Sequence, residues 1–269
     1  MPKRVQSASS INMFKQCPRK YYYAYIENLP TSPSIHTVRG NVVHSVLEDF
    51  FDLDITGVTK ETARGFLQDK IIGLLVKHWA EYKKEFDKVC VSPTESAKFK
   101  EETVIMLLNW LNHFINQVYS KDGSFEEVFK QFIPIREEFY ESSQYMVRGY
   151  IDAIERVDGK VHIIDYKTSK SAHLSSEYKL QMAIYLLLYQ EKHGGLPDKA
   201  SFFFLKHHAL NVPIEQELVE HARKEILEIH ARTEFSASKE DYRMQPGPLC
   251  RYCDFYELCY PKQKNLSNF

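Results

Sequence analysis

The stretch from residue 147 to residue 167 constrains the fold more than any other part of the chain. Two runs rich in β-branched residues, 147–157 and 160–167, flank Asp158-Gly159, a dipeptide typical of the tight turn of a β-hairpin. The period-2 alternation of a strand places four residues of the second run on one face, namely Val161, Ile163, Asp165 and Lys167. The pattern therefore predicts an antiparallel hairpin with one face that begins apolar and ends in a carboxylate and an ammonium group.

The charges of this hairpin have two interpretations. Asp152 lies in the first run, so a hairpin in register brings it close to Asp165. Two carboxylates beside Lys167 suit a hard divalent cation and a water molecule to be activated. Alternatively, Asp165 and Lys167 form an ordinary solvated ion pair at a strand end, which is the commoner role for isolated charges. The rest of the chain has to decide between these interpretations.

Two predicted helices carry polar residues that could join the hairpin. A helix that opens at Gly40 places His44 on one face with Leu47, Glu48 and Phe51. A histidine on such a face is usually a hydrogen-bonded core residue, and it is a metal-ligand candidate only if the two aspartates lie opposite. A second helix, 175–193, places Gln181 and Tyr185 one turn apart, where the glutamine could equally be a satisfied core amide.

The cysteines indicate a metal site. Cys250-x2-Cys253-x5-Cys259 is a dense set of ligands, whereas Cys17 and Cys90 stand alone. Inside a cell such thiols bind metal more often than they form disulfides. Zinc and an iron–sulfur cluster both fit this spacing, and Cys17 could supply a fourth ligand.

The remaining patterns complete an α/β chain. Ser9 or Ser10 can cap a short first helix, and residues 30–39 read as a loop. Residues 60–120 are helical in pattern and contain no evident chemistry. We expect strands over 132–140 and 200–206 and an amphipathic helix over 214–233.

Composition excludes several classes of protein. The sequence has no apolar run of about 18 residues, no signal-peptide core and no Walker-type glycine-rich loop. We therefore expect a cytoplasmic protein that neither spans a membrane nor carries an ATP motor. Its net charge of −1 means that nucleic-acid binding has to come from a local basic patch.

Taken in order, these motifs resemble the PD-(D/E)XK nuclease superfamily in its RecB-like branch. The resemblance rests on four motifs, namely Gly40-x3-His44, Gly149-x2-Asp152, Asp165-x-Lys167 and Gln181-x3-Tyr185. With Cys17-Pro-Arg-Lys-Tyr and the three late cysteines it extends to the iron–sulfur members, which include AddB-type nuclease domains and the small CRISPR-associated exonucleases of the Cas-four family. Ile151 replaces the proline of the name motif.

The resemblance implies a fold and a site. The fold is α/β, with a restriction-endonuclease-like mixed central sheet flanked by helices. A single nuclease domain covers 1–269, with a helical insert at 52–130 and an iron–sulfur segment at 244–262 that closes onto Cys17. The implied catalytic residues are Asp152, Asp165 and Lys167, and the implied ligands of Mg²⁺ or Mn²⁺ are His44, Asp152, Asp165 and the Tyr166 carbonyl. Gln181 and Tyr185 would position the substrate. The implied ligands of a [4Fe–4S] cluster are Cys17, Cys250, Cys253 and Cys259.

The resemblance also implies an activity and leaves its setting open. We expect a metal-dependent DNA nuclease, most simply an exonuclease on single strands or DNA ends in repair, with a helicase as a possible partner. The first alternative is a CRISPR-adaptation nuclease that trims spacer precursors beside an integrase. The second alternative is a DNA-binding subunit that does not cleave.

Overall fold

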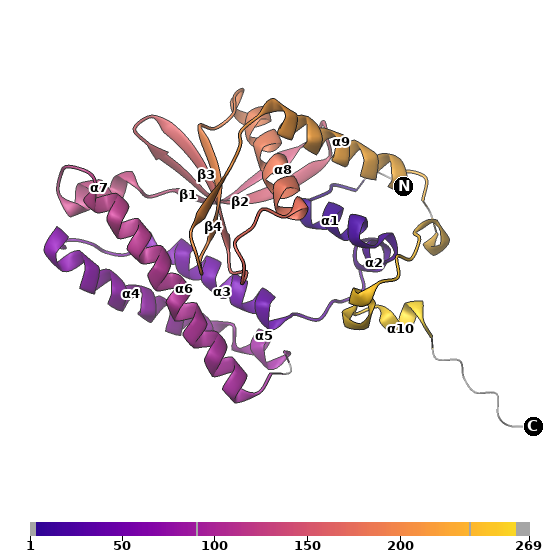
Figure 1. The fold of residues 1–269 in the computed structure, drawn as a ribbon, viewed down its shortest axis with the longest axis horizontal. Helices are drawn as coiled ribbons and strands as arrows, with labels where there is room; N and C mark the ends of the chain where they lie inside the picture. The colour runs from indigo at the N-terminus through magenta and orange to yellow at the C-terminus, as the bar shows by residue number, and fades with distance from the viewer. Residues whose placement is uncertain (1–3, 90, 237, 262–269) are drawn as a thin grey trace, which may run out of the picture.

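The fold is a mixed five-stranded sheet between two layers of helices (Figure 1). The computed structural model describes residues 4–261 except 90 and 237. The strands follow the order β1-β2-β3-β4-β5, and β3 and β4 are parallel whereas the other pairs are antiparallel. Their bounds are Ile135–Ser142, Val147–Val157, Lys160–Lys167, Lys199–Phe204 and Ala209–Val212. The predicted α/β, restriction-endonuclease-like sheet is therefore confirmed.

Each face of the sheet has its own hydrophobic core. Helices α3, α4, α6 and α7 pack on one face, and α1, α8 and α9 pack on the other (Figure 1). The helix bounds are α1 Ala8–Gln16, α2 Pro18–Tyr21, α3 Ile35–Phe50, α4 Lys60–Glu81, α5 Lys83–Asp87, α6 Pro93–Tyr119, α7 Phe125–Gln131, α8 Ser176–His193, α9 Gln216–Thr233 and α10 Tyr256–Cys259. A π-helical turn covers Tyr22–Ile26, and short 3₁₀ turns cover Lys239–Asp241 and Pro248–Tyr252.

The central hairpin forms as predicted. Asp158 and Gly159 have φ angles of 52° and 74°, the left-handed values that a tight hairpin turn requires. The β2–β3 ladder runs from Val157↔Lys160 to Ala153↔Ile164. In β3, Ile163 lies in the core under α8, and Lys167 contacts the same helix. The predicted alternation of faces along β3 is therefore confirmed.

Two predicted helix starts are wrong. The helix that carries His44 begins at Ile35 rather than Gly40, because the Ser34 hydroxyl accepts a hydrogen bond from the Thr37 N–H at 3.1 Å. The first helix is capped by Ser7 rather than by Ser9 or Ser10, and its hydroxyl accepts from the Ser10 N–H. In both cases an earlier serine takes the cap. Strand β5 is an element that the sequence patterns did not indicate.

The N-terminal segment contacts both β2 and the segment that follows α9. Gln6 pairs with Val147 at the start of β2, and Arg19 Nε donates to the Tyr242 carbonyl at 2.7 Å. Figure 1 shows α2 beside the segment that leads to α10. No helix in the described part of the chain has both the length and the apolarity to cross a bilayer.

Candidate active site

The site forms where the side-chain alternation of β1 and β2 shifts, so that residues two apart in one strand point to opposite faces of the sheet. We call this shift the face exchange. Arg136 contacts α3 through the Glu48 carbonyl, whereas Glu138, two residues later, binds Lys192 of α8 at 2.8 Å. In a regular strand these two side chains would share one face. β2 changes in the same place, because Ile151 and Ala153 lie in opposite cores. Glu137 and Asp152, the residues at the exchange, therefore sit where the sheet opens.

Backbone conformation and side-chain bonding mark this opening. Glu137 has a φ of 45°, which is uncommon for a residue other than glycine. The β2–β3 ladder ends at Ala153↔Ile164, and beyond it Asp152 Oδ2 accepts a hydrogen bond from the Tyr166 N–H at 2.8 Å. A side-chain acceptor thus takes over where the backbone pairing stops. The Asp152 carboxylate is held firmly as a result.

His44, Glu137 and Asp152 converge at this opening. Nδ1 of His44 lies 3.5 Å from Glu137 Oε1 and 3.5 Å from Asp152 Oδ2. One potential ligand atom from each of the three residues lies within 4.8 Å of the other two. One imidazole nitrogen and two carboxylate oxygens at such distances suit a divalent cation. This arrangement brings together two of the residues singled out in the sequence and adds Glu137.

Asp165 and Lys167 form a second, connected part of the site. Asp165 is 1% exposed, and its Oδ2 lies 2.6 Å from Lys167 Nζ. Among the described residues, neither carboxylate oxygen accepts a well-directed hydrogen bond. A buried carboxylate with unused lone pairs is costly unless a cation satisfies it. Asp165 does not belong to the three-residue group around His44, but its charge acts on both His44 and Asp152.

A chain of hydrogen bonds holds Lys167 from the opposite side. Lys167 Nζ donates to Gln181 Oε1 at 2.8 Å, and Gln181 Nε2 donates to the Tyr185 hydroxyl at 2.9 Å. Gln181 and Tyr185 both come from α8, one turn apart, as their spacing predicts. Tyr185 also packs beside Gly149, where an added Cβ would lie 3.1 Å from the ring. The small residue therefore lets α8 approach β2 closely.

The electrostatics of the site reflect its excess of carboxylates. Burial, and after it the charge of Asp165, raises the pKa of Asp152 to about 7. Burial alone would lower the pKa of His44, but Glu137, Asp152 and Asp165 outweigh it and raise this pKa to about 9. Burial also opposes the charge of Lys167, and Asp165 overcomes it, so that the pKa of Lys167 is raised. Positive charge is therefore favoured among these carboxylates.

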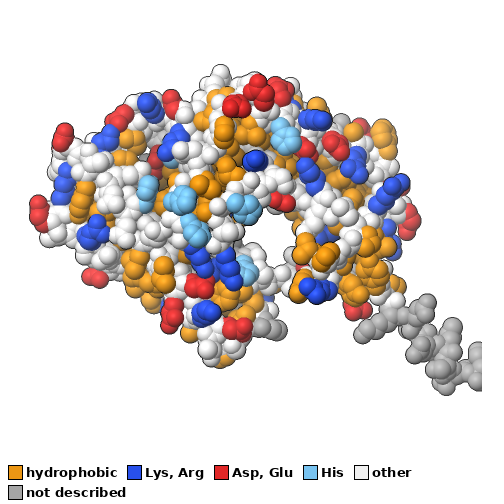
Figure 2. Space-filling view, viewed as in Figure 1, with side chains coloured by type: hydrophobic (Ala, Val, Ile, Leu, Met, Phe, Trp, Pro, Cys, Tyr) orange, Lys and Arg blue, Asp and Glu red, His pale blue; other side chains and the backbone are white. Residues whose placement is uncertain are grey.

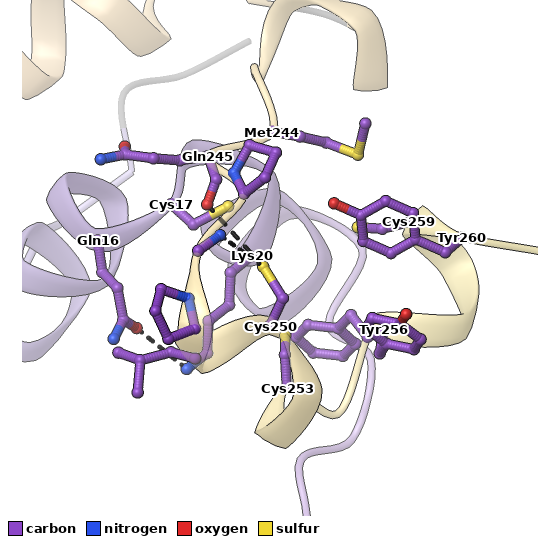
Figure 3. Close-up of a pocket in the computed structure, with 15 residues that line it drawn as sticks. Gln16, Cys17, Lys20, Met244, Gln245, Cys250, Cys253, Tyr256, Cys259 and Tyr260 are labelled. Carbon is purple, nitrogen blue, oxygen red and sulfur yellow. Dashed lines mark hydrogen bonds between the residues drawn. The ribbon is translucent and has the colours of Figure 1, made fainter.

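The four cysteines of the predicted cluster gather at one place. Cys17, from the junction of α1 and α2, and Cys250, Cys253 and Cys259 line a cavity of about 210 Å³ (Figure 3). All four are free thiols and half-buried. Burial, and next the neighbouring Cys17, raises the pKa of Cys259. Cys90 lies outside the described residues.

Glu137 is the site residue that sequence reasoning missed. It precedes a second glutamate in a strand, and alternation alone does not say which of the two faces the site. Its position in the strand could have identified it, because Glu137 falls opposite Asp152 if β1 and β2 form a hairpin. In the structure this position lies between the pairs Arg136↔Ala153 and Glu138↔Ile151.

Comparison with known proteins gives a family match along most of the chain and similarities to individual proteins. Residues 6–260 match the PD-(D/E)XK nuclease superfamily. The CRISPR-associated exonuclease Cas4 of Francisella tularensis subsp. novicida is 30% identical over 118 residues, which are 44% of this chain and 58% of that protein. The match thus spans little more than half of that relative.

Two further similarities cover most of the chain. The Gene 69 protein of Mycobacterium phage D29 is 23% identical over 95% of this chain and 96% of its own length. A crystal structure of a candidate exonuclease from Eubacterium rectale aligns with a TM-score of 0.47 at 10% identity, over 91% of this chain and 90% of that one.

Proposed function

Since the chain belongs to the PD-(D/E)XK nuclease superfamily, we propose that it is a metal-dependent deoxyribonuclease that hydrolyses phosphodiester bonds. The observation that carries the proposal is the meeting of His44 and Asp152 beside the Asp165–Lys167 pair. A subunit that only binds DNA would not need these four side chains together in one partly buried place. Metal-dependent hydrolysis of a phosphodiester bond does need them, because the carboxylates, the imidazole and the amine have to act on one phosphate.

The side chains fit a divalent cation. Both oxygens of Asp165 are buried, Oδ2 contacts Lys167 Nζ at 2.6 Å, and His44, Glu137 and Asp152 offer further ligand atoms at close range. We propose that these four residues hold Mg²⁺ or Mn²⁺, with the Tyr166 carbonyl added by family resemblance. The imidazole favours Mn²⁺ over Mg²⁺. When bound, such an ion polarises the scissile phosphate and acidifies a water molecule.

Lys167 is the group that would act on the reacting phosphate. Negative charge builds up on the phosphate oxygens as water attacks phosphorus and the P–O bond to the leaving oxygen breaks. An ammonium held by Asp165 and Gln181 can donate a hydrogen bond to the attacking water or to those oxygens without first reorganising. Tyr185 orients Gln181 and so positions Lys167 indirectly.

Basic side chains beside the site favour a polyanionic substrate. A cavity of about 520 Å³ next to Lys167 is lined by Lys170, His36 and His44 among others. Figure 2 shows the molecule hollowed near its centre, with Lys, Arg and His side chains gathered along one border of the hollow. Although the net charge is −1, this local patch suits the phosphates of DNA. We favour cleavage from DNA ends, as in repair.

The cysteine cluster has a structural role in this proposal. Four thiols around one cavity would crowd negative charge if ionised, and a bound metal cluster relieves it. We propose a [4Fe–4S] cluster, with zinc as the alternative that iron analysis decides. The chain would then be one nuclease domain over 1–269, with a helical insert at 52–130 and the 244–262 segment tied to Cys17. Closing so long a loop constrains the unfolded chain strongly.

A second candidate setting comes from one relative. The Francisella protein is named a CRISPR-associated exonuclease, so the same chemistry could trim spacer precursors beside an integrase. A helicase is the corresponding partner in a repair role. Co-purification with either partner separates the two settings.

Linear and circular single-stranded DNA of the same sequence test the proposal. We expect cleavage in Mn²⁺ or Mg²⁺, its loss in EDTA and its return when metal is added back. Degradation of the linear form alone establishes an exonuclease, and label at either end gives its polarity. An intact substrate under every metal condition would identify the non-cleaving subunit instead.

A further inference from the structure

Two exposed aromatic rings lie side by side on β1 and β2. Phe139 and Tyr150 are direct cross-strand partners, and their ring centroids are 5.1 Å apart at an interplanar angle of 49°. Phe139 is 41% exposed and Tyr150 is 56% exposed. Water is a poor environment for two neighbouring aromatic surfaces, so their exposure calls for an explanation.

The pair lies directly beside the candidate active site. Tyr150 is two residues from Asp152 on β2, and Phe139 is two residues from Glu137 on β1. Tyr150 and Asp152 also line the same cavity of about 510 Å³, together with Gln181. A polymer that reaches Asp152 through this cavity therefore passes over the Tyr150 ring.

The face exchange explains why these rings are exposed. On one side of the exchange lie the paired residues Arg136 and Ala153, whose side chains face α3 and its core. On the other side of the exchange, Ile151 packs under α8. Its neighbour Tyr150 and the cross-strand partner Phe139 therefore point away from that core. Arg148, also exposed, stands next to them and lines the same cavity.

We propose that Phe139 and Tyr150 form a stacking platform for an unpaired nucleobase next to the scissile phosphate. This proposal rests on the proposed nuclease function and names the side chains that would hold an unpaired base at the site. Aromatic faces bind bases of any sequence, whereas a base in a duplex first has to unpair and unstack, which costs free energy, so these rings favour an unpaired base. Arg148 would contact the adjoining phosphate.

Binding of a fluorescent single-stranded oligonucleotide, measured in EDTA so that nothing is cleaved, tests the platform. Tyr150→Leu and Phe139→Leu should each weaken binding about tenfold, whereas Tyr150→Phe keeps the stacking face and should bind like the parent. Phe235→Leu is the matched control, because Phe235 is 87% exposed and belongs to none of the site cavities described above. Thermal melting of each variant separates lost stacking from lost stability.

A series of single abasic substitutions along the oligonucleotide makes the test specific. In the parent protein one position should cost about tenfold in affinity, and in Tyr150→Leu that same substitution should cost nothing further, because the stacking partner is already gone. An equal penalty at every position in both proteins overturns the platform. If the parent cleaves DNA but the variants bind unchanged, the platform alone fails. If the parent neither binds nor cleaves DNA, the proposed function fails with it.

Discussion

Asp152 Oδ2 accepts a hydrogen bond from the Tyr166 N–H at 2.8 Å, just past the last backbone pair between β2 and β3. The same oxygen lies 3.5 Å from His44 Nδ1, so the Tyr166 N–H and the His44 imidazole both approach Oδ2. The hydrogen bond also orients the peptide that joins Asp165 to Tyr166. The positions of the acidic residues thus depend on an interruption of the sheet.

Replacing Glu137 by Gln should weaken Mn²⁺ binding by about tenfold to a hundredfold. The substitution removes one charge from the group around His44 and keeps the size of the side chain. Glu138→Gln is the control, because Glu138 faces α8 and binds Lys192. Calorimetric titration with Mn²⁺ measures both variants. Equal losses in the two would mean that general charge, and not ligation, is responsible.

Metal affinity should rise with pH. His44, with a pKa of about 9, and Asp152, with a pKa of about 7, carry protons in the metal-free site that a cation has to displace. Raising the pH removes these protons in advance, so binding tightens from about pH 6 to about pH 9 and releases fewer protons at the upper end. Calorimetry in two buffers of different ionisation enthalpy counts the protons. An affinity that is independent of pH contradicts the assigned ligands.

Gln181→Leu should lower kcat by up to about a hundredfold with little change in KM. The substitution removes the acceptor that positions Lys167, and misplacing a reacting group by a small distance is costly. Tyr185→Phe should have the same effect more weakly, because it releases Gln181 alone. Gln190→Leu, also on α8, is the control. A rise in KM without a fall in kcat would instead place Gln181 on the substrate.

Substituting Cys17 by Ser should remove bound iron and lower the thermal stability of the whole chain. In the proposed cluster, Cys17 would tie the beginning of the chain to the segment with Cys250, Cys253 and Cys259, which line the same cavity. Visible absorption and iron analysis of anaerobically purified protein report the cluster, and Cys90→Ser is the control outside the motif. Stoichiometric zinc in place of iron would refute the iron–sulfur cluster, although a metal would still link Cys17 to the three C-terminal cysteines.

Patterns local to one element predicted much of this molecule. The Asp158-Gly159 turn fixes the hairpin register, and the period-2 alternation of a strand predicts the shared face of Ile163, Asp165 and Lys167. The i, i+4 spacing of Gln181 and Tyr185 predicts their common direction on α8, where they are hydrogen-bonded. These relationships depend on backbone geometry that a few residues determine.

Relationships between elements were harder to predict. Nothing in the run 135–142 says that β1 exchanges faces at Glu137, because the exchange requires the positive φ of that residue and the matching break in β2. The start of α3 differs from the prediction for a simpler reason, since Ser34 caps the helix before the apolar pattern becomes regular. The face exchange therefore depends on packing between elements, whereas the start of α3 depends on a local capping hydrogen bond.

The most direct measurement follows the release of end label from single-stranded DNA in Mn²⁺ by the parent protein, Asp165→Asn and Lys167→Ala. The account predicts rapid release by the parent and a loss of at least about a hundredfold in both variants, with the circular dichroism spectrum and the iron content unchanged. Parental rates in either folded variant would contradict the assignment of this site.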